Sequence, residues 1–411
     1  MIRTASRLNR IDPFYVMECA KAADALARSP ACDPAQGGEP MIYLNIGEPD
    51  FGAAAPVQEA AHACLRSGRT QYTPATGLPE LRECIAAWYG SRFGVHVDAA
   101  RIVVTAGASA ALQLACLALF EPGDEVLMPD PSYPCNRHFV AAVGAHARLL
   151  PTTAQGRYQL DAASVAAAWG PATRAVLLAS PSNPTGTSIA HAEMAAIAQV
   201  VRAHGGISIV DEIYLGLSYE AAYGRSALAI TGADADIISI NSFSKYFGMT
   251  GWRLGWMVAP ETLVAPIEKL AQNLYICAST VAQRAALACF EPASMAEYER
   301  RRDYIVPALR SLGLPVPVTP DGAFYAWFDC QGFNASSWDF CFDMMRRAHV
   351  ALTPGRDFGP GQADRFVRLS FASSMPQLQA AVSRLARELP RTRTEPAGEV
   401  PTRPETPVTR R

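Results

Sequence analysis

Short apolar runs rich in β-branched residues alternate with alanine-rich windows of helical periodicity over roughly residues 70 to 290. The apolar runs are the expected strands: Arg101–Thr105, Glu125–Met128, Ala147–Leu150, Ala175–Ala179, Gly206–Asp211, Asp236–Asn241 and Leu254–Val258. The helical windows lie between them and include Ala108–Phe120, Asn136–Val143 and Ala190–His204. Apolar strands that alternate with helices are typical of a parallel sheet buried on both faces. We therefore expect an α/β large domain with a mostly parallel seven-stranded sheet covered by helices on both faces.

The pattern changes after about residue 290. The elements expected there are the helices Glu297–Leu312, Ser337–Ala348 and Met375–Glu388 and the strands Gly322–Asp329 and Phe366–Phe371. They indicate a smaller α+β domain over residues 291–389, and residues 48–290 then form the large domain. A helix at Pro13–Ala27 and a strand at Ile42–Ile46 assign residues 1–47 to the small domain. Residues 390–411, rich in Pro, Thr, Arg and Glu, are expected to form a disordered tail.

Composition narrows the class of protein. Half of the 411 residues are hydrophobic and 18% are charged, which allows sizeable cores. A formal net charge of −2 and the lack of a basic block argue against a nucleic-acid partner. No long apolar run predicts a membrane span, and the N-terminal residues lack the apolar core of a secretory signal. The ten cysteines show no Cys-x-x-Cys or zinc spacing, so we expect no metal site, and reduced thiols in the cytoplasm.

A lone lysine, Lys245, follows the expected strand Asp236–Asn241 in a glycine-punctuated segment. Burial at such a strand end lowers a lysine pKa, and a neutral amine is what Schiff-base chemistry with a carbonyl requires. Arg253, eight residues later, offers a planar fork suited to a phosphate. The alternative is a solvated surface lysine. One cavity that holds both an aldehyde and a phosphate would indicate pyridoxal phosphate.

Carboxylate and hydroxyl groups follow a second apolar run in Asp211-Glu212-Ile213-Tyr214. Asp211 is either a helix N-cap or an anion paired with a pyridinium nitrogen, which would keep a cofactor ring electron-withdrawing. Tyr214 could donate a hydrogen bond to the phenolic oxygen of that ring.

Two further residues suit a carboxylate ligand. Asn183 stands between prolines in Ser180–Thr187, which is either a plain loop or a preorganised segment whose amide binds a carboxylate and a ring oxygen. Arg368 lies in the middle of the apolar strand Phe366–Phe371, where a guanidinium is costly unless it is paired. It forms either a structural ion pair or a bidentate contact with an α-carboxylate.

Two loops complete the candidate constellation. Gly107, Ala108 and Ser109 join a strand to a helix, so they are either an ordinary turn or a phosphate cradle of backbone N–H groups. Tyr133, after the strand Glu125–Met128, either packs locally or stacks on a flat ring.

Together these motifs resemble the fold type I pyridoxal-phosphate enzymes and, within them, the class I/II aminotransferases of the aspartate aminotransferase superfamily. The resemblance extends from about Ile42 to about Ala372 and is most specific in Ser-Asn-Pro-Thr-Gly, Asp-Glu-Ile-Tyr and Ser-x-Ser-Lys followed by Gly-x-x-Gly-Trp-Arg. It implies the fold of a type I pyridoxal-phosphate transferase. It also implies a homodimer with shared active sites and an enzyme that moves an amino group from an L-amino acid to a 2-oxo acid.

The resemblance also implies a role for each matched residue. Lys245 is implied as the Schiff-base and proton-transfer residue. The implied ligands of the cofactor ring are Asp211, Tyr214, Asn183 and the stacking Tyr133. The implied phosphate ligands are Gly107, Ala108, Ser109, Ser242 and Arg253, together with Tyr72 reaching from the neighbouring subunit. The implied α-carboxylate ligands are Arg368, Asn183 and the backbone at Gly47.

The substrate is less defined. The segment Leu270–Gln283 contains no Arg or Lys, which weakens the case for a dicarboxylate amino donor. Phe51, Tyr275 and Phe324 are candidate walls for the substrate side chain. The motifs do not separate transamination from β-elimination or decarboxylation on the same scaffold. A non-catalytic ligand-sensing module is the alternative of another class.

Overall fold

The computed structural model describes residues 2–290 and 296–389. Its strands are β1 (Ile42–Tyr43), β2 (Ile102–Thr105), β3 (Glu125–Asp130), β4 (His146–Pro151), β5 (Thr173–Ala179), β6 (Ile207–Asp211), β7 (Ile237–Ser242), β8 (Gly255–Val258), β9 (Tyr325–Asp329), β10 (Val350–Ala351), β11 (Thr353–Pro354) and β12 (Phe366–Ser370). Its α-helices are α1 (Tyr15–Ala27), α2 (Ala55–Arg66), α3 (Pro79–Phe93), α4 (Ala108–Leu119), α5 (Pro134–Ala142), α6 (Ala162–Ala168), α7 (His191–Ala203), α8 (Ala233–Asp236), α9 (Glu261–Leu274), α10 (Thr280–Ala286), α11 (Ala296–Ser311), α12 (Ser337–Ala348) and α13 (Met375–Glu388).

A seven-stranded sheet organises the larger part of the molecule, in the order β2-β8-β7-β6-β5-β3-β4. Every neighbouring pair is parallel except the two that β8 makes with β2 and β7. Ser242 and Thr105 both pair with Gly255, so the carboxyl ends of β7 and β2 lie beside the amino end of β8. The predicted fold class is confirmed, with β8 as the antiparallel exception.

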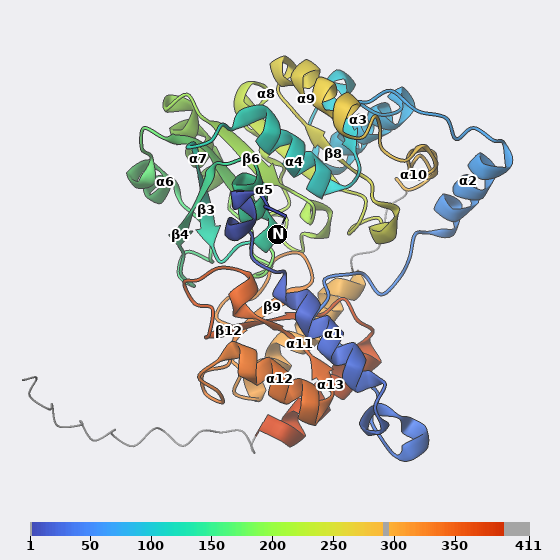
Figure 1. Ribbon diagram of the computed structural model, residues 1–411, viewed down its shortest axis with the longest axis vertical. Helices are drawn as coiled ribbons and strands as arrows, with labels where there is room; N and C mark the ends of the chain where they lie inside the picture. The colour runs from blue at the N-terminus through green and yellow to red at the C-terminus, as the bar shows by residue number, and fades with distance from the viewer. Residues whose placement is uncertain (1, 291–295, 390–411) are drawn as a thin grey trace, which may run out of the picture.

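Alternating side chains bury both faces of this sheet. On β5, Ala175 and Leu177 belong to the core that α4, α5 and α9 cover, whereas Val176 and Leu178 belong to the core under α6 and α7. Successive strand residues point to opposite faces, so an uninterrupted apolar run is what a two-sided cover requires. Figure 1 shows these helices around the sheet, above the smaller lobe.

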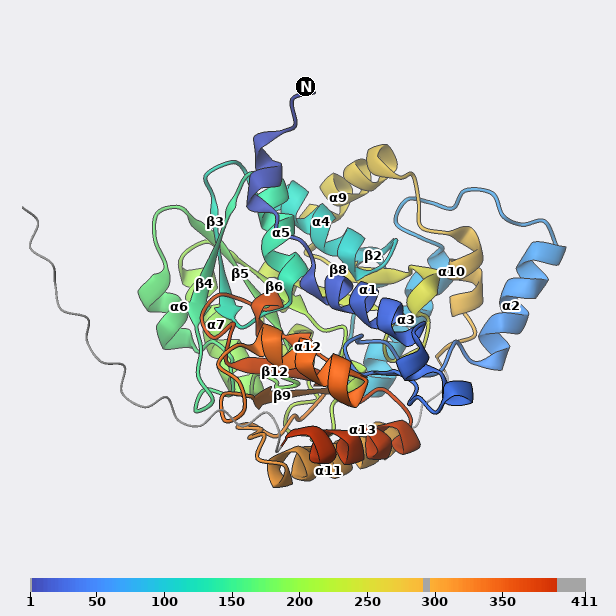
Figure 2. The same ribbon diagram turned by 60° about the horizontal axis from the view of Figure 1, so that its bottom comes forward.

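The smaller lobe contains a three-stranded antiparallel sheet in the order β11-β12-β9 and the parallel pair β1-β10. Figure 2 shows α11 and α13 side by side along β9 and β12, and α1 packs against β11 and α12. The predicted strand Ile42–Ile46 was too long, because pairing ends at Tyr43. Beyond it the backbone turns to other partners, and the Asn45 carbonyl accepts a hydrogen bond from Arg368.

The expected tail at residues 390–411 and the expected domain boundary at residue 291 lie outside the described residues. Across the described ranges, no helix combines the length and the hydropathy needed to cross a membrane.

Candidate active site

A cavity of about 440 Å³ opens at the edge of the large sheet where the parallel strands end. Its lining comes from both lobes and from the chain segment that leads into α1. Of the sequence-predicted residues, those that line it are Gly47, Ala108, Ser109, Tyr133, Asn183, Asp211, Tyr214, Ser242, Lys245, Arg253 and Arg368. Strand ends place them together because β3, β5, β6 and β7 all deliver their next residues to one edge.

Lys245 lies three residues beyond β7 and is largely removed from solvent. Its Nζ donates a hydrogen bond to the Gly47 carbonyl at 2.6 Å. Burial lowers the pKa of the Lys245 amine to about 8, a shift that the nearby Glu48 carboxylate opposes. Gly47 can come this close only without a side chain, because a Cβ there would lie 1.9 Å from the Tyr325 hydroxyl. Lys245 is therefore a partly buried amine within the cavity and not a solvated surface lysine.

Asp211 ends β6 with only 4% of its surface exposed. Its Oδ1 accepts a hydrogen bond from the Ile213 N–H at 3.1 Å, and no α-helix begins there, so it is not a helix N-cap. Burial raises the pKa of the Asp211 carboxyl to about 7, and the hydrogen bond and the Lys245 charge only partly oppose this. The site therefore holds an acid whose charge is poorly compensated by the protein alone.

This burial predicts a pH-dependent cost to the stability of the cofactor-free protein. Between about pH 4 and pH 7 the unfolded chain releases the Asp211 proton and the folded chain keeps it, so stability falls as pH rises. Asp211→Asn removes this cost. We expect the free energy of unfolding of the variant, minus that of wild type, to be larger at pH 8 than at pH 5 by about 2–3 kcal/mol. Chemical denaturation at the two pH values measures the difference, with the exposed Asp234→Asn as control. A difference that stays constant with pH would contradict the expectation.

Arg368, on β12, is only 3% exposed. Its Nη1 donates to Asn183 Oδ1 at 2.9 Å, and its Nη2 donates to the Asn45 carbonyl and to Thr353 Oγ1. Its guanidinium lies over the Tyr325 ring, 4.6 Å from the centroid, and its Nε has no partner. No carboxylate in the described ranges lies within ion-pair distance of Arg368. The structural ion pair is therefore not formed, and a buried cation faces the cavity beside Asn183.

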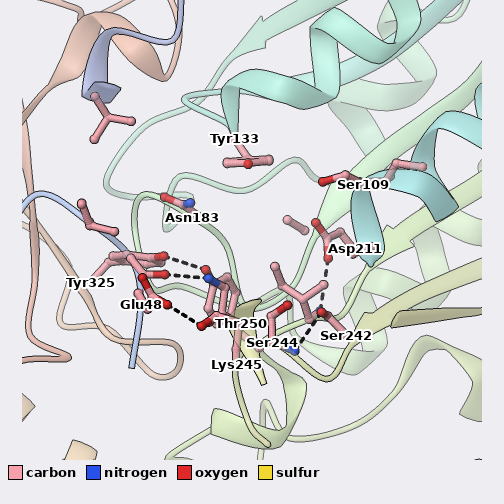
Figure 3. Close-up of a pocket in the computed structure, with 18 of the residues that line it drawn as sticks. Glu48, Ser109, Tyr133, Asn183, Asp211, Ser242, Ser244, Lys245, Thr250 and Tyr325 are labelled. Atoms are coloured by element: carbon pink, nitrogen blue, oxygen red, sulfur yellow. Dashed lines mark hydrogen bonds between the residues drawn. The ribbon is translucent and has the colours of Figure 1, made fainter. Parts of the chain in front are cut away.

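Two tyrosines lie beside Arg368 in the cavity. The hydroxyls of Tyr214 and Tyr325 share a hydrogen bond at 2.6 Å, and burial raises the pKa of Tyr214 well above its usual value. Tyr325 was not predicted, because it reads as one more apolar position of strand β9. Figure 3 shows Tyr133 across the cavity from Lys245, as a stacking residue would require.

Backbone donors and Arg253 form the end of the cavity near α4. Ala108 and Ser109 are the first residues of this twelve-residue helix, and such N–H groups have no partner within a helix. Arg253 Nη1 donates to the Thr250 carbonyl at 2.9 Å. Gly107 does not line the cavity but lets Arg253 approach, since a Cβ on it would lie 2.5 Å from Nη2. Helix N–H groups and a guanidinium at one end of a cavity are the chemistry that an anion requires, and we call this end the anion site.

Some expected residues do not line the cavity of this chain. Tyr72 is 78% exposed and is not among the lining residues, and its expected contact with a neighbouring subunit stays a prediction. The wall residues expected at Phe51, Tyr275 and Phe324 do not line it either. The cavity is instead lined by residues that sequence reasoning missed: Phe14, Val16, Met17, Ile46, Glu48 and Thr250. Those near residue 16 showed only the apolar spacing of an ordinary helix, so no local signal separated them from core residues.

Comparison with known proteins identifies the family. The family model for aminotransferases of class I and II matches residues 39–385. The chain belongs to this family of amino-group-transferring enzymes. It is 38% identical over 387 residues to a valine–pyruvate aminotransferase of Mycobacterium tuberculosis, covering 92% of this chain and 97% of that protein.

Crystal structures of aminotransferases have the same fold. The crystal structure of an aminotransferase from Mycobacterium tuberculosis superimposes with a TM-score of 0.89 at 37% identity, covering 95% of this chain and all of that one. An aspartate aminotransferase from Thermotoga maritima superimposes with a TM-score of 0.86 at 32% identity, covering 94% of this chain and all of that one.

Proposed function

We propose that the protein transfers an amino group from an L-amino acid to a 2-oxo acid with pyridoxal phosphate bound in this cavity. One observation carries the proposal: the amine of Lys245 and the ion-pair-free guanidinium of Arg368 line the same cavity. An amine of lowered pKa suits a carbonyl partner, and a buried guanidinium suits a carboxylate. The names of the aminotransferase relatives support the same reaction.

The residues present fit this cofactor. Lys245 would hold its aldehyde carbon, and the poorly compensated carboxylate of Asp211 would face its ring nitrogen. Tyr214 and Asn183 would bind its ring oxygen, and Tyr133 would cover its face. The anion site would hold its phosphate through the residues Gly107, Ala108, Ser109, Ser242 and Arg253. The fit rests on the donor set and on the glycine that leaves room for Arg253.

When bound, pyridoxal phosphate supplies an electron sink that acidifies the Cα–H of an amino acid. Arg368 and Asn183, with the backbone at Gly47, orient the substrate by its carboxylate, so that one bond at Cα is presented to Lys245. The Lys245 Nζ then takes the Cα proton and later returns it. With a pKa of about 8, a substantial fraction of this amine is neutral near that pH.

The test is a pair of half-reactions followed by the absorbance of the bound cofactor. An amino acid alone should convert the cofactor to its aminated form with release of one 2-oxo acid, and a second 2-oxo acid should reverse the change. A β-eliminating lyase would instead produce ammonia continuously without an acceptor. A ligand-sensing module would bind the cofactor and convert no amino acid. Either result would contradict the proposal.

We also propose that the active protein is a homodimer in which Tyr72 of one subunit reaches the phosphate of the other. The exposed Tyr72 side chain, unused in its own cavity, supports this arrangement. A monomeric mass for the fully active protein in analytical ultracentrifugation would refute it.

A cytoplasmic location is proposed for the same protein. All ten cysteines are free thiols, as is usual in a reducing compartment. Detection of the protein in a secreted fraction would contradict this.

A further inference from the structure

We infer that the cavity accepts amino acids with uncharged aliphatic side chains, and that Phe14, Val16 and Met17 form the wall that selects them. The inference rests on the proposed function and adds its substrate class. These three residues enter the cavity from the start of α1.

The charges that line the cavity disfavour an acidic side chain. Its cations are Lys245, Arg253 and Arg368, and each already has a role at the amine, the anion site or the α-carboxylate. No other Lys or Arg among the described residues lines the cavity. Two carboxylates also line the cavity: Asp211, which has its role at the cofactor ring, and Glu48, whose Oε1 accepts a hydrogen bond from Thr250 Oγ1. A second substrate carboxylate would therefore meet no unassigned cation of this chain and would be repelled by Glu48.

The wall itself is apolar and partly uncovered. Phe14, Val16, Met17 and Ile46 contribute to it, and Met17 and Ile46 remain 51% and 43% exposed although both line the cavity. Apolar surface left open inside a binding cavity favours a ligand group that covers it. Figure 3 places Glu48 beside Thr250 and Lys245, where its carboxylate accepts a hydrogen bond from Thr250 Oγ1 and stabilises the Lys245 charge, so it is already engaged by these two groups.

Short connections join this wall to the carboxylate site. Ile46 follows Asn45, whose carbonyl accepts from Arg368. The carboxylate of Asp357 accepts from the N–H groups of Tyr15 at 2.8 Å and Val16 at 2.7 Å, and the Arg368 charge stabilises that carboxylate. An amino acid bound by Arg368 therefore has the wall beside it.

The wall is also held by the large domain. Arg7 Nη1 donates to the Ala142 carbonyl at 3.2 Å, and Arg10 Nη2 donates to the Ala141 carbonyl at 3.4 Å, both at the end of α5. The rings of Phe14 and Tyr133 meet edge to face with centroids 6.3 Å apart. Contacts with both lobes preorganise the wall, and a preorganised wall discriminates between side chains.

The experiment compares kcat/KM for valine, leucine, aspartate and arginine as donors to the wild-type holoprotein. We expect valine and leucine to exceed aspartate and arginine by at least about 10-fold, the scale of hydrophobic-pocket discrimination. Met17→Arg places a cation on the wall and should shift the aspartate-to-valine ratio upward by about 10- to 100-fold. Leu8→Arg is the matched control, because Leu8 belongs to the same segment, is 54% exposed and does not line the cavity. The aspartate-to-valine ratio of Leu8→Arg should equal that of wild type.

The outcomes separate the inference from the function beneath it. If aspartate or arginine is the better donor of the wild-type protein, the substrate class is wrong while amino-group transfer stands. If Leu8→Arg shifts the ratio as much as Met17→Arg does, the assignment of the wall is wrong. If no amino acid converts the bound cofactor, the proposed function fails and the inference fails with it. The wild-type donor panel decides the substrate class even if Met17→Arg does not fold.

Discussion

Replacing Lys245 with alanine is expected to lower the rate of amino-group transfer by about 10⁴-fold, the upper range for loss of a general acid–base group. The variant loses the only amine that lines the cavity among the described residues, so no other group replaces Nζ. Steady-state transfer from valine or leucine to 2-oxoglutarate measures the effect. Circular dichroism and cofactor content should stay near wild type, since the anion site and Asp211 are untouched.

Two variants sharpen this prediction. Lys245→Arg keeps a positive charge but never becomes neutral, so it should be about as inactive as Lys245→Ala. Lys269→Ala removes an exposed lysine on α9 and should leave the rate unchanged. A Lys245→Ala protein that transfers amino groups at the wild-type rate would show that another group moves the proton.

Replacing Arg368 with alanine should lower kcat/KM for amino acids by about 10³-fold. The substrate carboxylate would then be buried without its cationic partner, which costs about 4 kcal/mol of binding free energy. Most of the loss should appear in KM, since the role that we propose for Arg368 is to bind the carboxylate and not to move a proton. Arg368→Lys should recover only part of it, because an ammonium cannot bind a carboxylate through two parallel hydrogen bonds.

A substrate comparison separates recognition of the carboxylate from a general loss of structure. Wild type should prefer valine strongly over isobutylamine, which has the same side chain without the carboxylate, and Arg368→Ala should lose that preference. Arg365→Ala is the matched control, since Arg365 lies next to β12 and forms an ion pair with Asp329 at 2.7 Å, with about half of its side chain exposed. Exposed ion pairs contribute about 0–1 kcal/mol, so its kinetics should change little. Retained preference for valine in Arg368→Ala would place the carboxylate elsewhere.

The predicted strands of the large sheet match the structure to within two residues at each end. Asp211 ends β6, as the apolar run indicated, and Ser242 ends β7, one residue beyond the predicted end at Asn241. Strand β3 was predicted too short, because Pro129 is a typical strand-ending residue, whereas the strand continues through it to Asp130. The antiparallel course of β8 also has no signature in its apolar run, because a buried strand looks the same in either direction.

The sequence by itself determined which residues follow the ends of the strands, and a parallel sheet brings such residues to one edge whatever the details of packing. That is why Lys245, Asp211 and Asn183 could be grouped before any distance was known. Only the tertiary structure decided what lies opposite them. The contact of Lys245 with Gly47 and the hydrogen bond of Tyr214 with Tyr325 join segments far apart in the chain. Met17, near the start of the chain, likewise lines a cavity formed by distant segments. Such contacts depend on how two lobes pack, and hydrophobic periodicity records that a residue is buried but not which partner buries it.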